Sequence, residues 1–447
     1  MASAAEQLAS SMSLGSFSKA TELKARIWFT LGALLVYRIG TYIPVPGVDA
    51  SVMGEMLAQH STGILGMFDM FSGGALGRMT VFALNIMPYI SASIIVQLMA
   101  GAVPSLETLK KEGEAGRKKL NQYTRYLTVL IALIQSYGIA VGLEGMRGNF
   151  GAAVIDPGLF FRVSCVVTLV GGTMFLMWIG EQITARGIGN GTSLIIFAGI
   201  VANLPSALVN LLELGRTGAL SPVFILLFIA IAVAVVAFVV FMERAQRRVT
   251  VQYPKRQVGQ RMFGGDSTHM PLKVNTAGVI PPIFASSILL IPATISGFAS
   301  SNPNSWLAWF AQKFAHGEPL YMITYAGMIL FFSYFYTAIV FNTEETADNL
   351  KKYGGFIPGV RPGSNTALYF DTILTRLTTV GAVYLAIVCL LPEILIARYG
   401  VPFYFGGTSL MIIVSVTMDT VTQIQSHLLA HQYEGLIRKG RVKGRQR

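Results

Sequence analysis

Ten long apolar runs recur along this sequence, and they constrain its fold more than any other feature. A helix needs roughly 17 to 25 predominantly apolar residues to cross the ~30 Å hydrocarbon core of a bilayer. The runs cover residues 27–43, 79–101, 126–143, 163–180, 191–211, 222–242, 274–298, 321–341, 377–397 and 405–427. We therefore predict an all-α, polytopic membrane protein with ten transmembrane helices.

Composition and motifs argue against a soluble enzyme or a metalloprotein. Only 13% of the residues are charged and 53% are hydrophobic, whereas charged residues make up ~25% of an ordinary soluble domain. Cys165 and Cys389 both lie inside apolar runs, so neither a disulfide framework nor a cysteine metal site is expected. The sequence contains no GxxxxGKS or GxxxxGKT phosphate loop, no HExxH and no GxSxG. We expect no catalytic residue, no metal and no cofactor.

The distribution of basic residues predicts the orientation of the spans. Loops on the N-terminal side of the membrane carry 27 Lys and Arg residues, and loops on the other side carry 6. Since Lys and Arg concentrate in cytoplasmic loops, both termini are expected in the cytoplasm. The first 25 residues are polar and lack the pattern of a signal peptide, so we expect this segment to be retained. Most of the net charge of +12 then follows from topology.

Two of the predicted cytoplasmic loops, 243–273 and 342–371, are long and basic. The alternation in Val249–Gln257 favours strand over helix and predicts a protruding hairpin in the first loop. In the second loop, glycines and prolines of KKYGGFIPGVRPG predict a fixed turn around an arginine. Such loops suit a large partner with an acidic or phosphate-rich surface, and contact with anionic lipids is the alternative. The basic residues singled out for docking are Lys255, Arg256, Arg261 and Arg361.

The ten spans divide into two halves of five, 27–215 and 216–430, flanked by segments 1–26 and 431–447. Because five is odd, the second half crosses the membrane with opposite orientation. This arrangement permits an inverted repeat of the kind found in many transport proteins.

A short sequence match supports the repeat. Pro88–Ile95 and Pro281–Ile288 agree at five of eight positions with a constant offset of 193. Each segment combines proline, which removes a backbone hydrogen bond, with small polar residues that can replace it. We therefore predict two locally weakened helices that face each other as a gate.

The segment ILGMFDMFSGGALG, at about 64–77, is apolar at helical spacing but too short to cross a membrane. A re-entrant helix of this length must be buried in protein or line a cavity. We predict a plug with a flexible tether at Gly73, Gly74 and Gly77, and a helix lying on the outer membrane surface stays the alternative. The plug residues are Ile64, Leu65, Met67, Phe68, Met70 and Phe71.

Two other classes of function compete with a channel. An ion-coupled secondary transporter of small solutes with ten spans needs charged side chains near mid-membrane. Only Arg38 and Asp419 lie well inside the spans, and both are close enough to an end to reach water or a neighbouring loop. A membrane-embedded enzyme or assembly scaffold lacks a nucleophile or metal motif. The spans therefore look suited to the passage of a substrate that charged side chains do not coordinate.

Several long segments resemble the SecY family, the central subunits of bacterial protein-translocation channels. The resemblance extends from about Glu22 to Tyr433. It is carried by RIGTYIPVPGVD (38–49), MFSGGALGRMTVFALNIMPYISASIIVQL (70–98), LMWIGEQITARGIGNGTSLIIFAGI (176–200), GDSTHMPLKVNTAGVIP (265–281), ETADNLKKYGGFIPGVRPG (345–363) and VPFYFGGTSLMI (401–412).

The resemblance implies a fold and a set of site residues. Two five-span halves would close like a clamshell around an hourglass pore, with the plug on the external side and a lateral gate between spans 2 and 3 and spans 7 and 8. A ring of isoleucines would seal the waist by excluding water. The ring residues implied are Ile86, Ile90, Ile196, Ile283 and Ile412, and the gate residues are Pro88, Ser91, Ser93, Gln97, Pro281, Ser286 and Ser287.

The resemblance also implies function, location and partners. The chain would pass unfolded secretory proteins across the bacterial inner membrane and release transmembrane segments sideways into it. SecE, SecG, the SecA motor ATPase, ribosomes, unfolded preproteins with their signal sequences and anionic lipids are the implied partners. Two departures from the family pattern, Thr192 beside the ring and the second proline of Pro281-Pro282, are expected to weaken the resting seal.

Overall fold

The computed structural model describes most of the residues of the chain. These are residues 21–49, 52–53, 69, 72–145, 147–148, 151–217, 221–254, 256–258, 261–263, 267–299, 318–399 and 407–444. The chain packs as two compact units, Met1–Ala207 with Ile412–Arg447, and Leu208–Met411. Each unit is described by itself.

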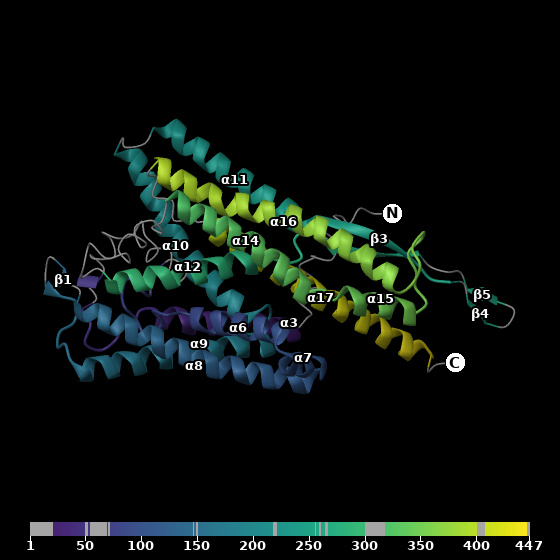
Figure 1. The fold of residues 1–447 in the computed structure, drawn as a ribbon, viewed down its shortest axis with the longest axis horizontal. Coiled ribbons are helices and arrows are strands. Elements are labelled where there is room, and N and C mark those ends of the chain that lie inside the picture. The colour runs from purple at the N-terminus through teal and green to yellow at the C-terminus, as the bar shows by residue number, and fades with distance from the viewer. Residues whose placement is uncertain are drawn as a thin grey trace. The chain divides into compact units, whose positions relative to one another are not determined.

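The first unit is a helical bundle in which α6, α8 and α9 pack against one another and α3 packs on α9 (Figure 1). A short hairpin of β1 (Arg147–Gly148) and β2 (Gly151–Ala152) follows α8. The helices of this first unit are α3 (Thr21–Gly40), α6 (Met87–Ala102), α7 (Pro104–Lys111), α8 (Glu114–Gly145), α9 (Leu159–Arg186), most of α10 (Gly191–Arg216) and most of α17 (Gly407–Gly444).

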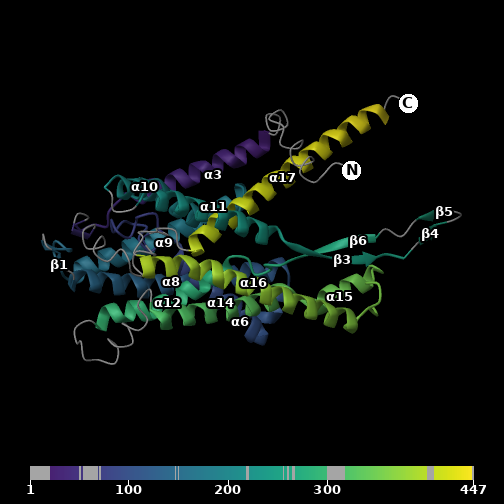
Figure 2. The same cartoon turned by 90° about the horizontal axis from the view of Figure 1, so that it is seen from above.

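In the second unit, α14 packs against both α12 and α16, and α15 packs on α16 (Figure 2). The helices are α11 (Pro222–Arg244), α12 (Ile280–Ala299), α14 (Pro319–Val340), α15 (Thr343–Lys352) and α16 (Ser364–Tyr399). The strands between α11 and α12 are β3 (Gln246–Gln252), β4 (Arg256–Val258), β5 (Arg261–Phe263) and β6 (Ser267–Lys273).

Each of the ten predicted spans coincides with a helix. Among the described residues, seven helices are long and apolar enough to cross a membrane. The pair α6 and α7, bent by 102° at the break between them, raises this number to eight. The shorter apolar helix in α12 and the 20-residue helix α3 account for the other two predicted spans.

The prolines of the predicted gate helices begin those helices instead of interrupting them. The second span was predicted to start at Met79, but α6 starts at Met87, after turns in which Met79 and Asn85 have φ of 45° and 50°. Pro88 is the second residue of α6, and Pro281 and Pro282 follow the first residue of α12. In a first turn the missing N–H costs no helical hydrogen bond, so the predicted weakening by these prolines is wrong.

The predicted hairpin is present between α11 and α12. Strands β3 and β6 pair antiparallel from Gln246↔Lys273 to Gln252↔Ser267, and β4 pairs with β5 beyond them (Figure 2). Val249 and Val251 are buried on one face of β3, as the alternating sequence predicts.

The two basic loops fold together. The backbone of Gln252 in β3 exchanges two hydrogen bonds with that of Phe356, both 2.9 Å between nitrogen and oxygen. The two loops and α16 also share a buried apolar cluster, which consists of Val249, Leu272, Ile357, Phe370 and Ile373. We refer to β3, β6, α15 and the turn at 353–363 as the two-loop body.

Candidate functional site

The ring isoleucines fall on four helices. Ile86 is the N-cap of α6, and its carbonyl accepts the Ile90 N–H at 3.1 Å, so both residues belong to the first turn of that helix. Ile86, Ile196 and Ile412 are buried, whereas Ile90 and Ile283 are partly exposed. Ile283 lies on α12 in the second unit, and the other four lie in the first unit.

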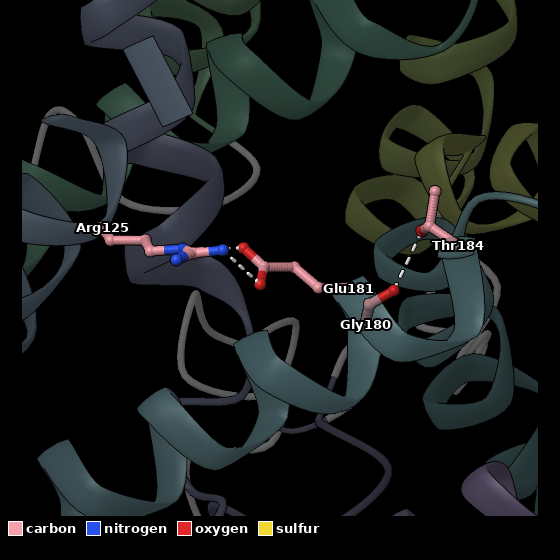
Figure 3. Close-up of polar contacts among 4 residues, drawn as sticks. All are labelled: Arg125, Gly180, Glu181 and Thr184. Carbon is pink, nitrogen blue, oxygen red and sulfur yellow. Dashed lines mark hydrogen bonds and ion pairs between the residues drawn. The ribbon is translucent and has the colours of Figure 1, made fainter. Parts of the chain in front are cut away.

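Helices α9 and α10 approach each other closely at two glycines, Gly180 and Gly191, and this crossing determines what surrounds Ile86. A Cβ at Gly191 would collide with the carbonyl oxygen of Gly180, so α9 and α10 approach to backbone contact. A Cβ built at Gly180 would lie 3.5 Å from Cδ1 of Ile86. The Thr184 hydroxyl donates to the Gly180 carbonyl at 2.9 Å (Figure 3). The same hydroxyl accepts the Gly191 N–H at 2.9 Å. The crossing therefore packs α6, α9 and α10 together at this isoleucine.

The turn between α9 and α10 also binds two further helices. Thr30 of α3 accepts the Ile188 N–H at 3.1 Å, and Gln423 of α17 accepts the Gly189 N–H at 2.7 Å. Leu23, Ile188 and Leu428 form an apolar cluster beside these bonds. The sequence predicted only a tight connection here, because nothing local indicates bonds to residues so far along the chain.

The polar groups of Thr192 form hydrogen bonds at the start of α10. Its hydroxyl donates to Oδ1 of Asn190 at 2.7 Å, and its N–H donates to the same oxygen at 3.1 Å. Asn190 therefore caps the start of α10, as asparagine often does at helix N-termini.

An ion pair that sequence reasoning missed joins α8 to α9. Arg125 donates to both oxygens of Glu181, at 3.0 and 2.7 Å (Figure 3). The side chains are 48% and 30% exposed, so the pair contributes roughly 0–1 kcal/mol, with its bidentate geometry adding orientation. The partners are 56 residues apart, a separation at which sequence gives no pairing signal.

Polar groups of the predicted gate residues bond within their own helices. Gln97 donates to the Ser93 hydroxyl at 3.2 Å. The hydroxyls of Ser286 and Ser287 donate to the Ile283 carbonyl at 2.9 and 2.8 Å. Such bonds satisfy hydroxyl groups inside an apolar helix. Pro88 and Pro281 are buried, and Ser91 is partly exposed.

The predicted plug residues Ile64, Leu65, Met67, Phe68, Met70 and Phe71 lie outside the described residues. The turn that follows them is described and is held by α3. Arg38 donates to the Gly73 carbonyl at 2.9 Å, and Tyr37 donates to the Ser72 carbonyl at 3.2 Å. Arg78 donates to the carbonyls of Gly74 and Gly73 at 2.9 and 3.1 Å.

The glycines predicted to form a flexible tether have defined backbone roles in this turn. Gly73 and Gly74 have φ of 68° and 83°, which favours glycine. The Asp69 carboxylate accepts the Gly77 N–H at 2.6 Å. Burial raises the pKa of Asp69, and the Gly77 N–H and the charge of Arg78 partly oppose that rise. This turn, at the end of the predicted plug segment, is therefore held by hydrogen bonds.

The predicted docking residues lie on or near the two-loop body. Lys255 lies outside the described residues, and Arg256 and Arg261 lie in the paired strands β4 and β5. Arg361 is exposed on a turn in which Gly359 and Gly363 have φ of 83° and 114°. Its carbonyl accepts the hydroxyl of buried Thr366 at 3.0 Å, so the predicted turn is present.

The family model described as SecY matches residues 80–421, about three quarters of this chain. The chain belongs to the SecY family. The protein translocase subunit SecY of Rickettsia bellii (strain RML369-C) is 56% identical over 429 residues, which cover 96% of this chain and 99% of the relative.

Solved structures support the SecY fold. A structure described as that of a protein conducting channel has a TM-score of 0.65 and 16% identity, and the match covers 91% of this chain and 92% of the other. Sec61 in the canine ribosome-channel complex from the endoplasmic reticulum has a TM-score of 0.61 and 15% identity, with the same coverage of 91% and 92%. These similarities confirm the ten-span SecY fold predicted from the sequence.

Within the described part of this SecY-family chain, no group of three or more His, Cys, Asp or Glu side chains could hold a metal ion. Cys165 and Cys389 are buried, and no disulfide joins them. The chemistry offered by these residues is apolar packing and backbone bonding, together with an exposed basic surface on the two-loop body.

Proposed function

We propose that this chain is the central subunit of a bacterial protein-conducting channel that passes unfolded secretory proteins across the inner membrane. In the same proposal it releases transmembrane segments sideways into the bilayer. The observation that carries the proposal is the 56% identity to a protein translocase subunit SecY along 96% of the chain. We propose no catalytic activity for the chain itself, so a partner must supply the energy for transport.

The conducting path is proposed to narrow at Ile86, Ile90, Ile196, Ile283 and Ile412. Isoleucine side chains offer water and ions no hydrogen-bonding partner, so a ring of them closes by dewetting and still yields to a passing chain. Support comes from the first turn shared by Ile86 and Ile90 and from the packing of Ile86 at the α9–α10 crossing.

We propose that the segment at about 64–77, which includes the bonded turn of Gly73 and Gly74, is the plug, and that the lateral gate lies on α6 and α12. An apolar stopper on a fixed base can leave the pore while its attachment stays in position. Deleting Leu65–Met70 is expected to raise the resting ion leak of reconstituted channels without preventing export. An unchanged leak would favour a helix on the membrane surface.

The two-loop body is proposed as the cytoplasmic docking surface, with both termini in the cytoplasm. The exposed basic residues on this body are Arg247, Arg248, Lys273, Lys351, Lys352 and Arg361. Their charge suits the SecA motor ATPase or the phosphates of ribosomal RNA, and contact without base readout is enough for such docking. SecE and SecG are proposed as the small membrane subunits, and anionic lipids as further ligands of the basic loops.

The test is export by the purified complex. The chain is isolated from membranes with its small subunits and reconstituted in vesicles, and uptake of an unfolded preprotein is measured with SecA and ATP. The proposal requires ATP-dependent uptake and co-purification of a SecE-like subunit. Saturable uptake of a small solute without preprotein transport would instead favour the ten-span secondary transporter.

A further inference from the structure

A buried amide bonds to both sides of the junction between the hairpin and α12. Asn275 Nδ2 donates to Oε1 of Glu243, at the end of α11, at 2.6 Å. The same nitrogen donates to the carbonyl of Gly278, in the turn before α12, at 3.1 Å. One side chain therefore joins the helix that leads into the hairpin to the helix that leaves it.

Burial makes this connection strong. Asn275 is only 5% exposed, so its hydrogen bonds do not compete with water. One acceptor is a carboxylate, and hydrogen bonds to charged acceptors are stronger than those between neutral groups. A further backbone bond, from the Val274 N–H to the Ala245 carbonyl at 3.0 Å, closes the base of the hairpin beside it.

The junction is also seated on α16. A Cβ at Gly381 would lie 2.8 Å from the Val274 carbonyl oxygen and 3.5 Å from Cα of Asn275. The backbone before α12 therefore runs directly against the helix, without an intervening side chain that could rearrange. Thr276 contributes no such bond, since its buried hydroxyl has no hydrogen-bond partner in the described part of the chain.

We propose that Asn275 is a positioning residue that transmits displacement of the two-loop body to α12. The inference rests on the proposed function, in which a partner docks on that body and α12 carries Ile283 and the gate serines. Because the amide bonds both sides of the junction, movement of the hairpin base must carry the first turn of α12 with it. Without the amide, the body still binds its partner but α12 no longer follows.

The rigidity of the junction can be measured directly. Spin labels are placed at Ser267 of β6 and Ile288 of α12, both exposed, in the purified complex in lipid bilayers. A narrow distance distribution is expected for the parent chain and for Thr276→Val, the neighbouring control. Asn275→Ala is expected to broaden it. An equally narrow distribution in Asn275→Ala would overturn the proposal.

The functional readout separates docking from transmission. In Asn275→Ala we expect unchanged SecA affinity and about a tenfold lower rate of preprotein transport, the factor expected for one charge-assisted bond. Arg361→Glu should instead reduce the affinity itself. If Arg361→Glu leaves docking unchanged, the docking assignment fails while the distance measurement still decides the role of Asn275. A parallel loss of affinity and transport in Asn275→Ala would indicate a merely structural role and would contradict transmission.

Substitutions of Glu243 cover the case in which Asn275→Ala does not insert. Glu243→Gln keeps an oxygen acceptor for the amide and should retain both the narrow distance and the transport rate. Glu243→Leu removes the acceptor and should reproduce the broad distance and the slow transport. Equal behaviour of the two variants would overturn the proposal.

Discussion

Single side chains fix the helix crossings of the first unit because each bonds to the backbone of another element. Thr184, Thr30 and Gln423 all accept N–H groups of the short turn after α9. Backbone N–H groups in apolar surroundings need such partners. The absence of a side chain at Gly191 matters equally, because its backbone contacts that of Gly180 where α9 and α10 approach each other.

The glycine crossing gives a first prediction. Gly191→Ala places a methyl group against the Gly180 carbonyl and should destabilise the chain by about 1–3 kcal/mol. Thermal unfolding of the purified complex measures this. The control is Gly171→Ala, in the neighbouring helix α9, where a Cβ would meet no atom within 4 Å. Equal stability of the two variants would contradict the crossing.

Asp69 gives a prediction about pH. Burial raises its pKa above the ordinary value of 3.8. A carboxyl group with a raised folded-state pKa binds its proton more tightly in the folded chain, so its contribution to stability falls as pH rises from about 4 through that pKa. Asp69→Asn keeps an acceptor for Gly77 but does not titrate. The stability of the parent chain relative to Asp69→Asn should therefore decrease with rising pH, measured as thermal unfolding across that range.

At the scale of elements, the sequence patterns predicted the helices, a strand and a turn, because interactions between nearby residues determine these features. Each of the ten apolar runs coincides with a helix, and alternation predicted the strand that became β3. Turn chemistry predicted the fixed loop at Arg361, since Gly359 and Gly363 have the positive φ that glycine permits. In contrast, α6 starts only after turns in which Met79 and Asn85 have positive φ, and at Met79 no residue preference indicates this conformation.

Contacts between distant segments could not be predicted. The Arg125–Glu181 pair, the bond from Asn275 to Glu243 and the Gln252–Phe356 bridge all join residues that only the fold brings together. The ring residues Ile86 and Ile412 came from the family resemblance, since an isoleucine in a membrane helix is otherwise ordinary packing.

The two-loop body gives the prediction at this scale. Arg361→Glu should abolish SecA-driven transport while insertion and thermal stability stay normal, because the side chain is exposed and the turn is held by Thr366 through the backbone. Reversal of one docking charge mainly affects the encounter with the partner. Arg216→Glu, a charge reversal on the opposite predicted side of the membrane, is the control. Transport at the parent rate in Arg361→Glu would remove this residue from the docking surface.

At the scale of the whole molecule, the seal proposed above takes residues from both packing units. Ile90 belongs to the first unit and Ile283 to the second, and the sequence repeat relates their segments at an offset of 193. A seal built from both units needs apolar bulk from each.

The proposed seal gives a prediction that concerns one residue from each unit. Ile90→Asn with Ile283→Asn should wet the constriction and let reconstituted channels conduct ions, because amides offer water hydrogen bonds that isoleucine does not. Ile90→Leu with Ile283→Leu keeps the apolar bulk and should stay tight. Single-channel recording in planar bilayers compares the two. Equal conductance would exclude these residues from the seal.

The shared core of the two-loop body has a consequence for chimeric proteins. Val249 and Leu272 of the hairpin share a buried cluster with Ile357 of the other loop and with Phe370 in the α16 helix that follows it. A hairpin grafted alone from a relative would bring its apolar face to a foreign surface, and mismatched volumes in a packed core are costly. Exchange of docking specificity between relatives therefore requires both loops to be transplanted together.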